Sequence, residues 1–283
     1  MAKHRFKNVL YHYTNCESLF GMLQGYSEDN PNFTMWATHY AFMNDSSEYE
    51  FGKRVCKEAM QIYENRNRLT VEQSFFTYLT DDVTKMWTEQ EPYIISLSED
   101  DSSAAMWSMY ADGGEGIALI IDNENRVLMN IDDNYSTKPK PSKCHYCEKS
   151  TDLVDDQTIL FLHKVFEILT TDTNSRITIH PIDAYLMMPP TFKHKAFEYE
   201  KEHRFVFMNR NDKYEIKHRR RNGKIVPYIE EKIPSSHIKG IIVGPRADFE
   251  QVKLSLQMFF KGKGGDLIRL CDEIYQSDIP FRG

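Results

Sequence analysis

Three glutamates recur at every second position in the segment 197–207, and this pattern constrains the fold more than any other stretch. Glu198, Glu200 and Glu202 are followed two residues later by Arg204. In a β-strand, side chains two residues apart share a face, about 7 Å from each other. Strands tend to exclude glutamate, and neighbouring carboxylates repel each other unless cations lie nearby. The conflict predicts either a functional site or a charged edge strand that discourages aggregation.

The composition is that of an ordinary globular protein with an acidic balance. The chain has 283 residues, of which 41% are hydrophobic and 27% charged, and this provides ample material for a core. Aromatic residues reach 13%, which favours strand-rich packing or ring-lined pockets. A formal net charge of −7 argues against nucleic-acid binding by the whole surface, although a local basic patch could still bind.

The sequence favours a cytoplasmic location without a membrane partner. Its first residues contain no apolar run typical of a secretory signal, and no stretch approaches the ~18 consecutive apolar residues of a spanning helix. Five cysteines are an odd number in a long chain. Such a set fits a reducing cytoplasm better than a disulfide framework.

Short strands and amphipathic helices are predicted throughout the chain, and no composition break or flexible linker divides it. This predicts a single mixed α+β domain over residues 1–283. The polar stretch 123–150 is interpreted as an exposed insertion in its middle. Strands are expected at residues 9–14, 33–38, 93–100, 117–121 and 238–244, in the glutamate segment, and in a hairpin over 214–233. Helices are expected after residue 15, through 55–63 and 106–110, and over 69–79, 152–171, 249–260 and 266–275.

Two weaker motifs are better explained by local structure than by ligand binding. Cys144 and Cys147 form a CxxC pair, but a zinc site of this kind needs a matching second half, which the sequence lacks. Gly113, Gly114 and Gly116 resemble a phosphate-binding loop, yet no helix with a Lys-Ser/Thr ending follows. We interpret them as turn glycines and expect no metal site.

A hairpin with a basic tip follows the glutamate segment. Asn222 and Gly223 form a strong turn signal, and six of the eight residues from 217 to 224 are basic when His218 is counted. Such a tip is usually only solvated, but in an acidic protein it could also attract a phosphate backbone. We therefore predict a nucleic-acid-binding role for Arg219, Arg220, Arg221 and Lys224.

Five short stretches, taken in their order and spacing, resemble a known family. They are Leu10–Thr14, Asn44–Glu48, Ile95–Asp100, Met106–Ala111 and Tyr199–Arg204. Together they are similar to the bacterial domain-of-unknown-function 2971 family, and they extend over most of the chain.

That family in turn resembles, more remotely, the ADP-ribosyltransferase superfamily. There the site combines a His or Arg on an early strand, a Ser, Thr or Tyr element in the middle and a Glu on a late strand. His12, then Ser96 or Ser98, then Glu200 or Glu202 stand in that order here. The resemblance implies an ADP-ribosyltransferase-like split β-sheet core with flanking helices, and NAD as the substrate.

The resemblance assigns catalysis to Glu200 or Glu202 together with His12. Cleavage of the bond between nicotinamide and ribose leaves positive charge on the sugar, and a nearby carboxylate stabilises that charge. Arg204 is two residues from Glu202 and four from Glu200, so strand alternation predicts Glu202 as its partner and Glu200 as the free carboxylate. A bulge at Lys201 would invert these roles.

The remaining expected contacts are with NAD. An imidazole at position 12 would orient the dinucleotide, Ser96 or Ser98 would brace the glutamate, and Trp107 or Tyr110 would cover the nicotinamide ring. The full set expected to bind NAD is His12, Tyr13, Thr14, Ser96, Ser98, Trp107, Tyr110 and Arg204.

The leading hypothesis is a NAD-dependent ADP-ribosyltransferase. Its relatives imply a toxin of a toxin–antitoxin or anti-phage defence system, for which an antitoxin protein would be a partner. The basic hairpin favours RNA or DNA over protein as the acceptor. Two alternatives stay open: a NAD glycohydrolase that transfers the ribosyl group to water, and a non-catalytic module of the same fold that senses a nucleotide or nucleic acid. The presence of His12 with Glu200 and Glu202 favours catalysis.

Overall fold

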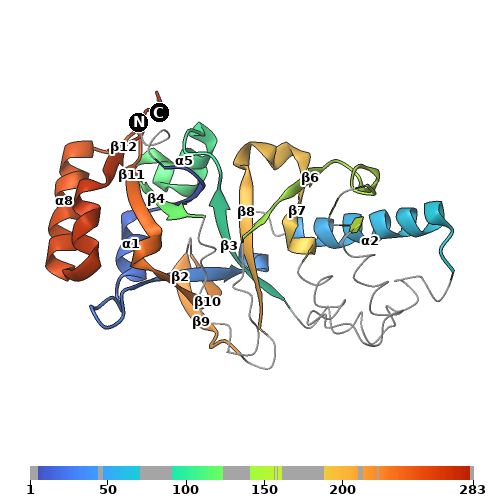
Figure 1. The fold of residues 1–283 in the computed structure, drawn as a ribbon, viewed down its shortest axis with the longest axis horizontal. Coiled ribbons are helices and arrows are strands. Elements are labelled where there is room, and N and C mark those ends of the chain that lie inside the picture. The colour runs from blue at the N-terminus through green and yellow to red at the C-terminus, as the bar shows by residue number, and fades with distance from the viewer. Residues whose placement is uncertain are drawn as a thin grey trace.

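A computed structural model describes residues 6–43, 47–70, 91–123, 141–155, 157, 159–160, 188–209, 213–221 and 223–280. The helices predicted over 69–79 and 152–171 lie mostly outside the described residues. Within the described residues, the mixed α+β class is confirmed, with helices packed around one large sheet (Figure 1). The same residues contain no helix that is both long and apolar enough to cross a membrane.

The sheet has ten strands, and all of its pairings are antiparallel except that of β11 with β12. Along its main path the strand order is β12-β11-β4-β1-β3-β2-β10-β9, and β8 and β5 lie off this path. The strands are β1 (Val9–Thr14), β2 (Asn32–His39), β3 (Pro92–Ser98), β4 (Ile117–Asp122), β5 (Ser142–Lys143), β8 (Glu202–Met208), β9 (Lys217–Arg221), β10 (Lys224–Pro234), β11 (Ile238–Val243) and β12 (Ile274–Gln276). A separate two-stranded sheet joins β6 (His145–Cys147) to β7 (Phe192–His194).

The large sheet splits at β3. One edge of β3 pairs with β8 along its whole length. The other edge is shared, because β1 pairs with it only at Ser98, whereas β2 pairs with it at Tyr93 and Ile94. From there β1 leads to β4, β11 and β12, and β2 leads to β10 and β9. The sheet therefore forks into two arms, and the middle of β3 is left open between them.

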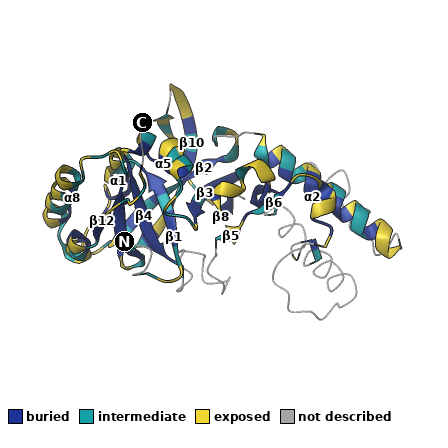
Figure 2. Cartoon of the chain, turned by 90° about the horizontal axis from the view of Figure 1, so that it is seen from above, coloured by how far each residue is buried: buried dark blue, intermediate teal, exposed yellow. Residues whose placement is uncertain are grey.

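Helices cover the large sheet at both faces. The helices in contact with it are α1 (Cys16–Met22), α5 (Ala104–Tyr110) and α8 (Phe249–Lys263), whereas α2 (Glu48–Asn67) packs beside the smaller sheet. The main core packs α1, α8 and the 3-10 helix η9 (Gly265–Asp272) against the strands, whose inward residues are fully buried (Figure 2). A second cluster packs α5 on the opposite face, around Trp107. The third cluster joins α2 to β6 and β7 at the end of the molecule away from α8 (Figure 1).

Local signals explain several element boundaries. Asn15 accepts a hydrogen bond from the Ser18 amide and so caps α1, and Ser103 caps α5 in the same way. The hairpin joins β9 to β10, with Gly223 at a φ of 76°, a conformation that glycine adopts without a steric penalty. The end of the chain differs from the prediction, because residues 266–275 form η9 and part of β12 instead of one helix.

Two further predictions need correction. Residues 142–147 are not part of an exposed insertion, because β5 pairs with β8, β6 pairs with β7, and Cys144 and Cys147 are buried. Residues 124–140 of that stretch lie outside the described residues. The glutamate segment is also not one continuous strand. Residues Lys195–Glu200 form the 3-10 helix η6, and β8 begins only at Glu202.

Candidate functional site

A cavity of about 630 Å³ lies where the sheet forks. This volume is in the range of small-molecule sites, roughly 300–1,000 Å³. Its walls are formed by residues 11–14 of β1, 94–97 of β3, Trp36 and Thr38 of β2, and 219–221 of β9. Side chains from α5, η6 and β8 complete it. The fork is what opens this space, because the two arms separate along the unpaired middle of β3.

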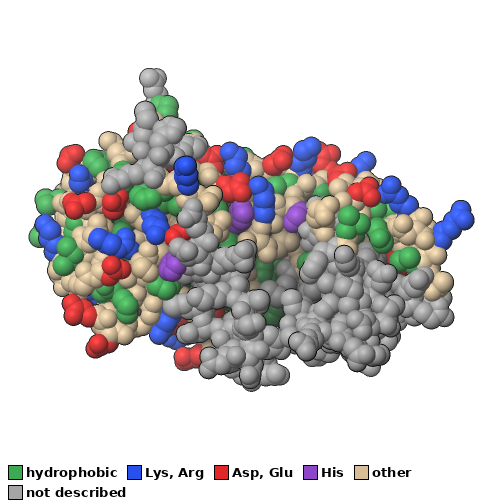
Figure 3. Space-filling model, in the orientation of Figure 1, with side chains coloured by type: hydrophobic (Ala, Val, Ile, Leu, Met, Phe, Trp, Pro, Cys, Tyr) green, Lys and Arg blue, Asp and Glu red, His purple; other side chains and the backbone are tan. Residues whose placement is uncertain are grey.

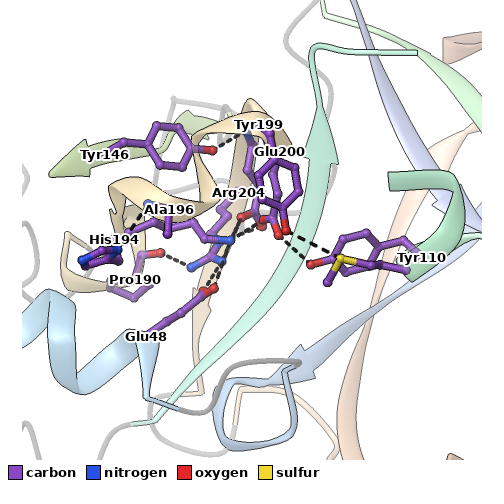
Figure 4. A network of polar contacts seen from close by, with 12 residues as sticks. Glu48, Tyr110, Tyr146, Pro190, His194, Ala196, Tyr199, Glu200 and Arg204 are labelled. Carbon is purple, nitrogen blue, oxygen red and sulfur yellow. Dashed lines mark hydrogen bonds and ion pairs between the residues drawn. The ribbon is translucent and has the colours of Figure 1, made fainter. Parts of the chain in front are cut away.

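A cluster of five charged side chains, four of them buried and Glu48 half-buried, forms one wall of the cavity. The side chains are between 2% and 11% exposed and come from α2, β7, η6 and β8. Figure 4 labels Glu48, Glu200 and Arg204 of this group. Lys193 Nζ lies 3.0 Å from Glu48 Oε1 and 2.7 Å from Glu202 Oε2, and it also contacts Glu200. Arg204 holds Glu202 through two bonds, Nε to Oε1 at 2.8 Å and Nη2 to Oε2 at 2.9 Å, and it contacts Glu48. We call these five side chains the ion cluster.

The ion cluster holds three carboxylates against two cations. The environments of Glu202 and Glu200 move their pKa values in opposite directions. Burial raises the pKa of Glu202, but the charges of Arg204 and Lys193 outweigh it and lower this pKa to about 2. For Glu200, burial dominates the attraction of Lys193, and the charge of Glu202 adds to it, so its pKa is raised. Two carboxyls with separated pKa values are characteristic of acid–base sites.

The turn at Lys201 brings both carboxylates to Lys193. Lys201 has φ 45° and ψ 49°, the left-handed conformation that costs a non-glycine residue roughly 1–2 kcal/mol. It separates η6 from β8, so Glu200 and Glu202 do not alternate along one strand. The predicted pairing of Glu202 with Arg204 is confirmed. The prediction that Glu200 is free is wrong, because it is paired with Lys193.

Glu200 is held from three directions. Tyr110 donates its hydroxyl to Glu200 Oε1 at 2.8 Å (Figure 4). Ser98 donates to the Glu200 main-chain carbonyl at 2.6 Å, so this serine braces the glutamate through its backbone. Burial, followed by the charge of Glu200, raises the pKa of Tyr110, which therefore stays a hydroxyl donor. Tyr110 and Lys193 together fix the orientation of the carboxylate.

The side chain of His12 on β1 lies beside the middle of β3, which neither β1 nor β2 pairs with. Its Nδ1 lies 3.0 Å from the carbonyl oxygen of Ser96, which can only accept, so Nδ1 carries the proton. Burial lowers the pKa of His12, and the charge of Arg219 lowers it further. A neutral ring with a proton on Nδ1 leaves Nε2 as a hydrogen-bond acceptor. His12 therefore supplies an acceptor at the cavity wall.

The other predicted NAD-binding residues divide into two groups. Tyr13, Thr14 and Ser96 line the cavity, and among the described residues the buried Ser96 Oγ has no hydrogen-bond partner. Tyr13 donates its hydroxyl to the Asp100 carbonyl at 2.6 Å. The expectation that Trp107 covers a ligand ring is wrong, because Trp107 is 0% exposed and packs edge-on against Tyr13 in the core. Tyr110 remains for that role.

The basic hairpin is also partly a cavity wall. Arg219, Arg220 and Arg221 line the cavity, whereas Lys224 lies outside it. On β9 the exposure alternates, with residues 217, 219 and 221 half-buried and 218 and 220 exposed. This alternation follows from the strand period of two. The sequence predicts a solvated hairpin tip, and on β9 this holds only for the face that carries residues 218 and 220.

Sequence reasoning missed the residues that complete the ion cluster. Glu48 stands at the start of α2, where an acidic residue is common because of the helix dipole, yet its carboxylate contacts Lys193 and Arg204. Lys193 precedes the glutamate pattern and carries no motif. Its signal is indirect, since three closely spaced carboxylates require a cation nearby. Tyr146 was also missed, although its hydroxyl accepts a hydrogen bond from the Glu202 amide at 2.8 Å.

The lowered pKa of Glu202 predicts acid sensitivity. A carboxyl whose folded pKa is below its unfolded value stabilises the protein above the unfolded pKa and loses this contribution as the pH falls. We therefore expect the Glu202 contribution to the free energy of unfolding to disappear between pH 4.5 and about 2. Urea unfolding at a series of pH values should show a shallower acid decline for Glu202→Gln than for wild type. Glu115→Gln is the control, because Glu115 is exposed, and it should decline with acid as wild type does. An equal decline of the unfolding free energy with falling pH in wild type and Glu202→Gln would contradict the lowered pKa of Glu202.

In the part of the chain that the structure describes, no group of three or more His, Cys, Asp and Glu side chains is arranged to hold a metal ion. Cys144 lies near the charges of Glu202 and Arg204, whereas Cys147 packs in the cluster of α2. The CxxC pair therefore contributes to two different environments.

Comparison with known proteins relates part of the chain to a family. No curated protein and no solved structure matches the chain. Residues 106–205 match a family described as "Protein of unknown function (DUF2971)". The matched region contains Tyr110 and every member of the ion cluster except Glu48. The family resemblance that the sequence predicted is thus found over residues 106–205.

Proposed function

We propose that this protein is a NAD-dependent ADP-ribosyltransferase that acts in the cavity at the fork. The observation that supports this most strongly is the convergence of His12, Tyr110 and Glu200 on one cavity, although they are far apart in the sequence. Each comes from a different element, β1, α5 and η6. They offer a neutral acceptor, a hydroxyl beside an aromatic ring, and a carboxylate.

These groups suit the cleavage of an N-glycosidic bond. The Glu200 carboxylate would stabilise the positive charge that develops on the ribose when the bond between C1′ and the nicotinamide nitrogen breaks. The electron pair of that bond returns to the nicotinamide ring, whose positive charge it cancels. An acceptor O–H then forms the new bond to C1′, and its proton passes to Glu200. A carboxyl with a raised pKa is suited to accept this proton.

The hairpin supports a nucleic acid as the acceptor. Arg220 and Lys224 are exposed, and Arg220 also lines the cavity, so a strand bound to the hairpin would lie at the edge of the reaction site. Acidic and basic side chains are interspersed over the described part of the face in Figure 3. Recognition of a phosphate backbone would therefore be local, at the hairpin. A toxin role in a toxin–antitoxin or anti-phage system, with an antitoxin as partner, is proposed on the family resemblance.

NAD labelled in its adenylate half tests this function. The protein is incubated with labelled NAD alone, with RNA, with DNA and with a protein extract. Label transferred to RNA or DNA would support the proposed transferase. Release of free ADP-ribose in every mixture would replace it by a NAD glycohydrolase. Intact NAD in every mixture would reject both enzymes and leave a non-catalytic sensing module.

His12→Ala is expected to weaken NAD binding more than it slows the chemical step. The substitution removes the Nε2 acceptor, which in this proposal holds a ribose hydroxyl, and one such bond corresponds to a roughly tenfold loss of affinity. Steady-state kinetics should show KM for NAD rising about tenfold with a smaller change in kcat. The control is His218→Ala on the exposed face of β9. An unchanged KM would remove His12 from the binding site and leave it as a support for the Ser96 carbonyl.

A further inference from the structure

Arg219 is fixed in the cavity by two aromatic rings. Its guanidinium lies 4.9 Å from the ring centre of Trp36 and 5.5 Å from that of Tyr228. Its Nη2 donates to Thr38 Oγ1 at 2.8 Å. Trp36 and Thr38 belong to β2 and Tyr228 to β10, so two neighbouring strands hold the side chain in place. Cation–π contacts of this kind orient an arginine without neutralising its charge.

The charge of Arg219 is not compensated. Among the described residues, no carboxylate forms an ion pair with it, and its buried Nε has no hydrogen-bond partner. The charged or titratable groups that face it are His12, Arg221 and Tyr228. Burial, followed by the neighbouring charge of Arg221, lowers the pKa of Arg219 to about 10. A desolvated cation beside another cation is unfavourable unless an anion joins it.

We infer that Arg219 is the receptor for a phosphate group of a nucleotide in this cavity. The guanidinium fork matches phosphate oxygens, and burial strengthens the charge-assisted bonds. Arg221 follows on the same face of β9 and adds positive charge to the same wall. The carboxylates of the ion cluster line another wall and would repel the phosphate, so an anionic ligand has one favoured orientation. The inference rests on the proposed function in that NAD carries such a group.

This role replaces the predicted nucleic-acid contact for Arg219. Its guanidinium is stacked on Trp36 and Tyr228, whereas Arg220 and Lys224 are exposed. The hairpin therefore divides its basic residues by face. One face binds the small ligand, and the other is available to a nucleic acid.

Calorimetric binding of ADP and of adenosine, which differ only in the phosphates, tests the inference. We expect ADP to bind wild type more tightly than adenosine does. Arg219→Met keeps an apolar stem on the two rings but removes the charge, and it should weaken ADP binding roughly 10- to 100-fold. Adenosine binding should be unchanged, and Arg219→Lys should retain part of the ADP affinity. Circular dichroism and thermal melts check that each variant is folded.

Arg54→Met is the matched control. Arg54 also lies over an aromatic ring, that of Phe51 at 5.4 Å, but its side chain is 57% exposed on α2 and is not part of the cavity wall. Arg54→Met changes the net charge by the same amount as Arg219→Met and should leave ADP binding unaltered. Equal ADP affinity in wild type and folded Arg219→Met would overturn the inference. So would equal affinity of wild type for ADP and adenosine, or no binding of either.

The two proposals fail in different ways. If ADP binds through Arg219 but NAD is never cleaved, the phosphate receptor stands and the transferase proposal fails. If NAD is cleaved equally well by wild type and Arg219→Met at limiting substrate, the transferase proposal stands and the phosphate receptor fails. Binding of ADP requires no chemical step, so the first result does not depend on an acceptor.

Discussion

Glu200→Gln is expected to abolish NAD cleavage while the protein remains folded. The amide keeps the shape of the side chain. Its oxygen can accept from Lys193 and its NH2 group can donate to the Tyr110 hydroxyl, but it carries no charge and accepts no proton. Loss of a positioned general base or of charge stabilisation costs roughly 10²- to 10⁴-fold in rate. Single-turnover cleavage of labelled NAD should therefore fall by at least about 100-fold. A thermal melt of the same sample checks the fold.

Glu198→Gln is the matched control for this substitution. Glu198 lies on the same 3-10 helix two residues earlier, but it is exposed and does not belong to the ion cluster. Its substitution should leave cleavage unchanged. An active, folded Glu200→Gln beside an inactive, folded Glu202→Gln would exchange the roles of the two glutamates. That result would mean that the carboxylate with the lowered pKa performs the chemistry.

Much of the sheet could be predicted because its signals are local. The apolar run 93–98 and the alternation of Ser96 and Ser98 identify β3, and both serines lie opposite charged residues of β8. The turn signal at Gly223 identifies the hairpin. Strand alternation also gave the correct partner for Arg204, because Glu202 and Arg204 do lie on one strand and one face.

The inner part of the site depends on contacts between distant segments and could not be predicted in this way. Lys193 belongs to β7, and Glu48 begins α2, yet both lie within 3.0 Å of each other in the ion cluster. Nothing near either residue in the sequence indicates its partner. From the sequence, Lys201 is expected to be at most a β-bulge. Its left-handed turn instead brings both Glu200 and Glu202 to Lys193. Local propensity disfavours such a turn, and the contacts of the ion cluster offset its cost.

The position of Arg219 illustrates the same limit. Its charge suggests a solvated tip or a phosphate contact, and the sequence does not distinguish them. The stacking rings belong to Trp36 and Tyr228, which come together only because β2 and β10 lie side by side. Trp107 shows the opposite case. It has the aromatic character of a ligand-stacking residue, but α5 packs it into the core.

Lys193→Met is expected to cause the largest loss of stability among single substitutions in the ion cluster. It removes the cation that contacts all three carboxylates, so only Arg204 is left to balance them. Removing one partner of a buried ion pair typically costs about 3–5 kcal/mol. Urea unfolding at pH 7 should show a loss of this size in the free energy of unfolding. Lys143→Met is the control, because Lys143 pairs with Glu99 at 3.1 Å but is 58% exposed, and it should cost at most about 1 kcal/mol.

A double substitution separates the charge imbalance from lost packing. Lys193→Met leaves three carboxylates and one cation, and adding Glu200→Gln removes one of those carboxylates. If repulsion among the carboxylates is the main cost, the double variant should be more stable than Lys193→Met alone, although Glu200→Gln lowers stability in the wild-type background. The coupling free energy from the four proteins measures this interaction directly. Two results would contradict this: additive losses, or a cost for Lys193→Met no greater than that for Lys143→Met. Either would show that Lys193 contributes through the packing of its apolar side-chain stem and not through the charge that it places beside the carboxylates. The raised pKa of Glu200 would then reflect its burial and the charge of Glu202, without an offsetting attraction from Lys193.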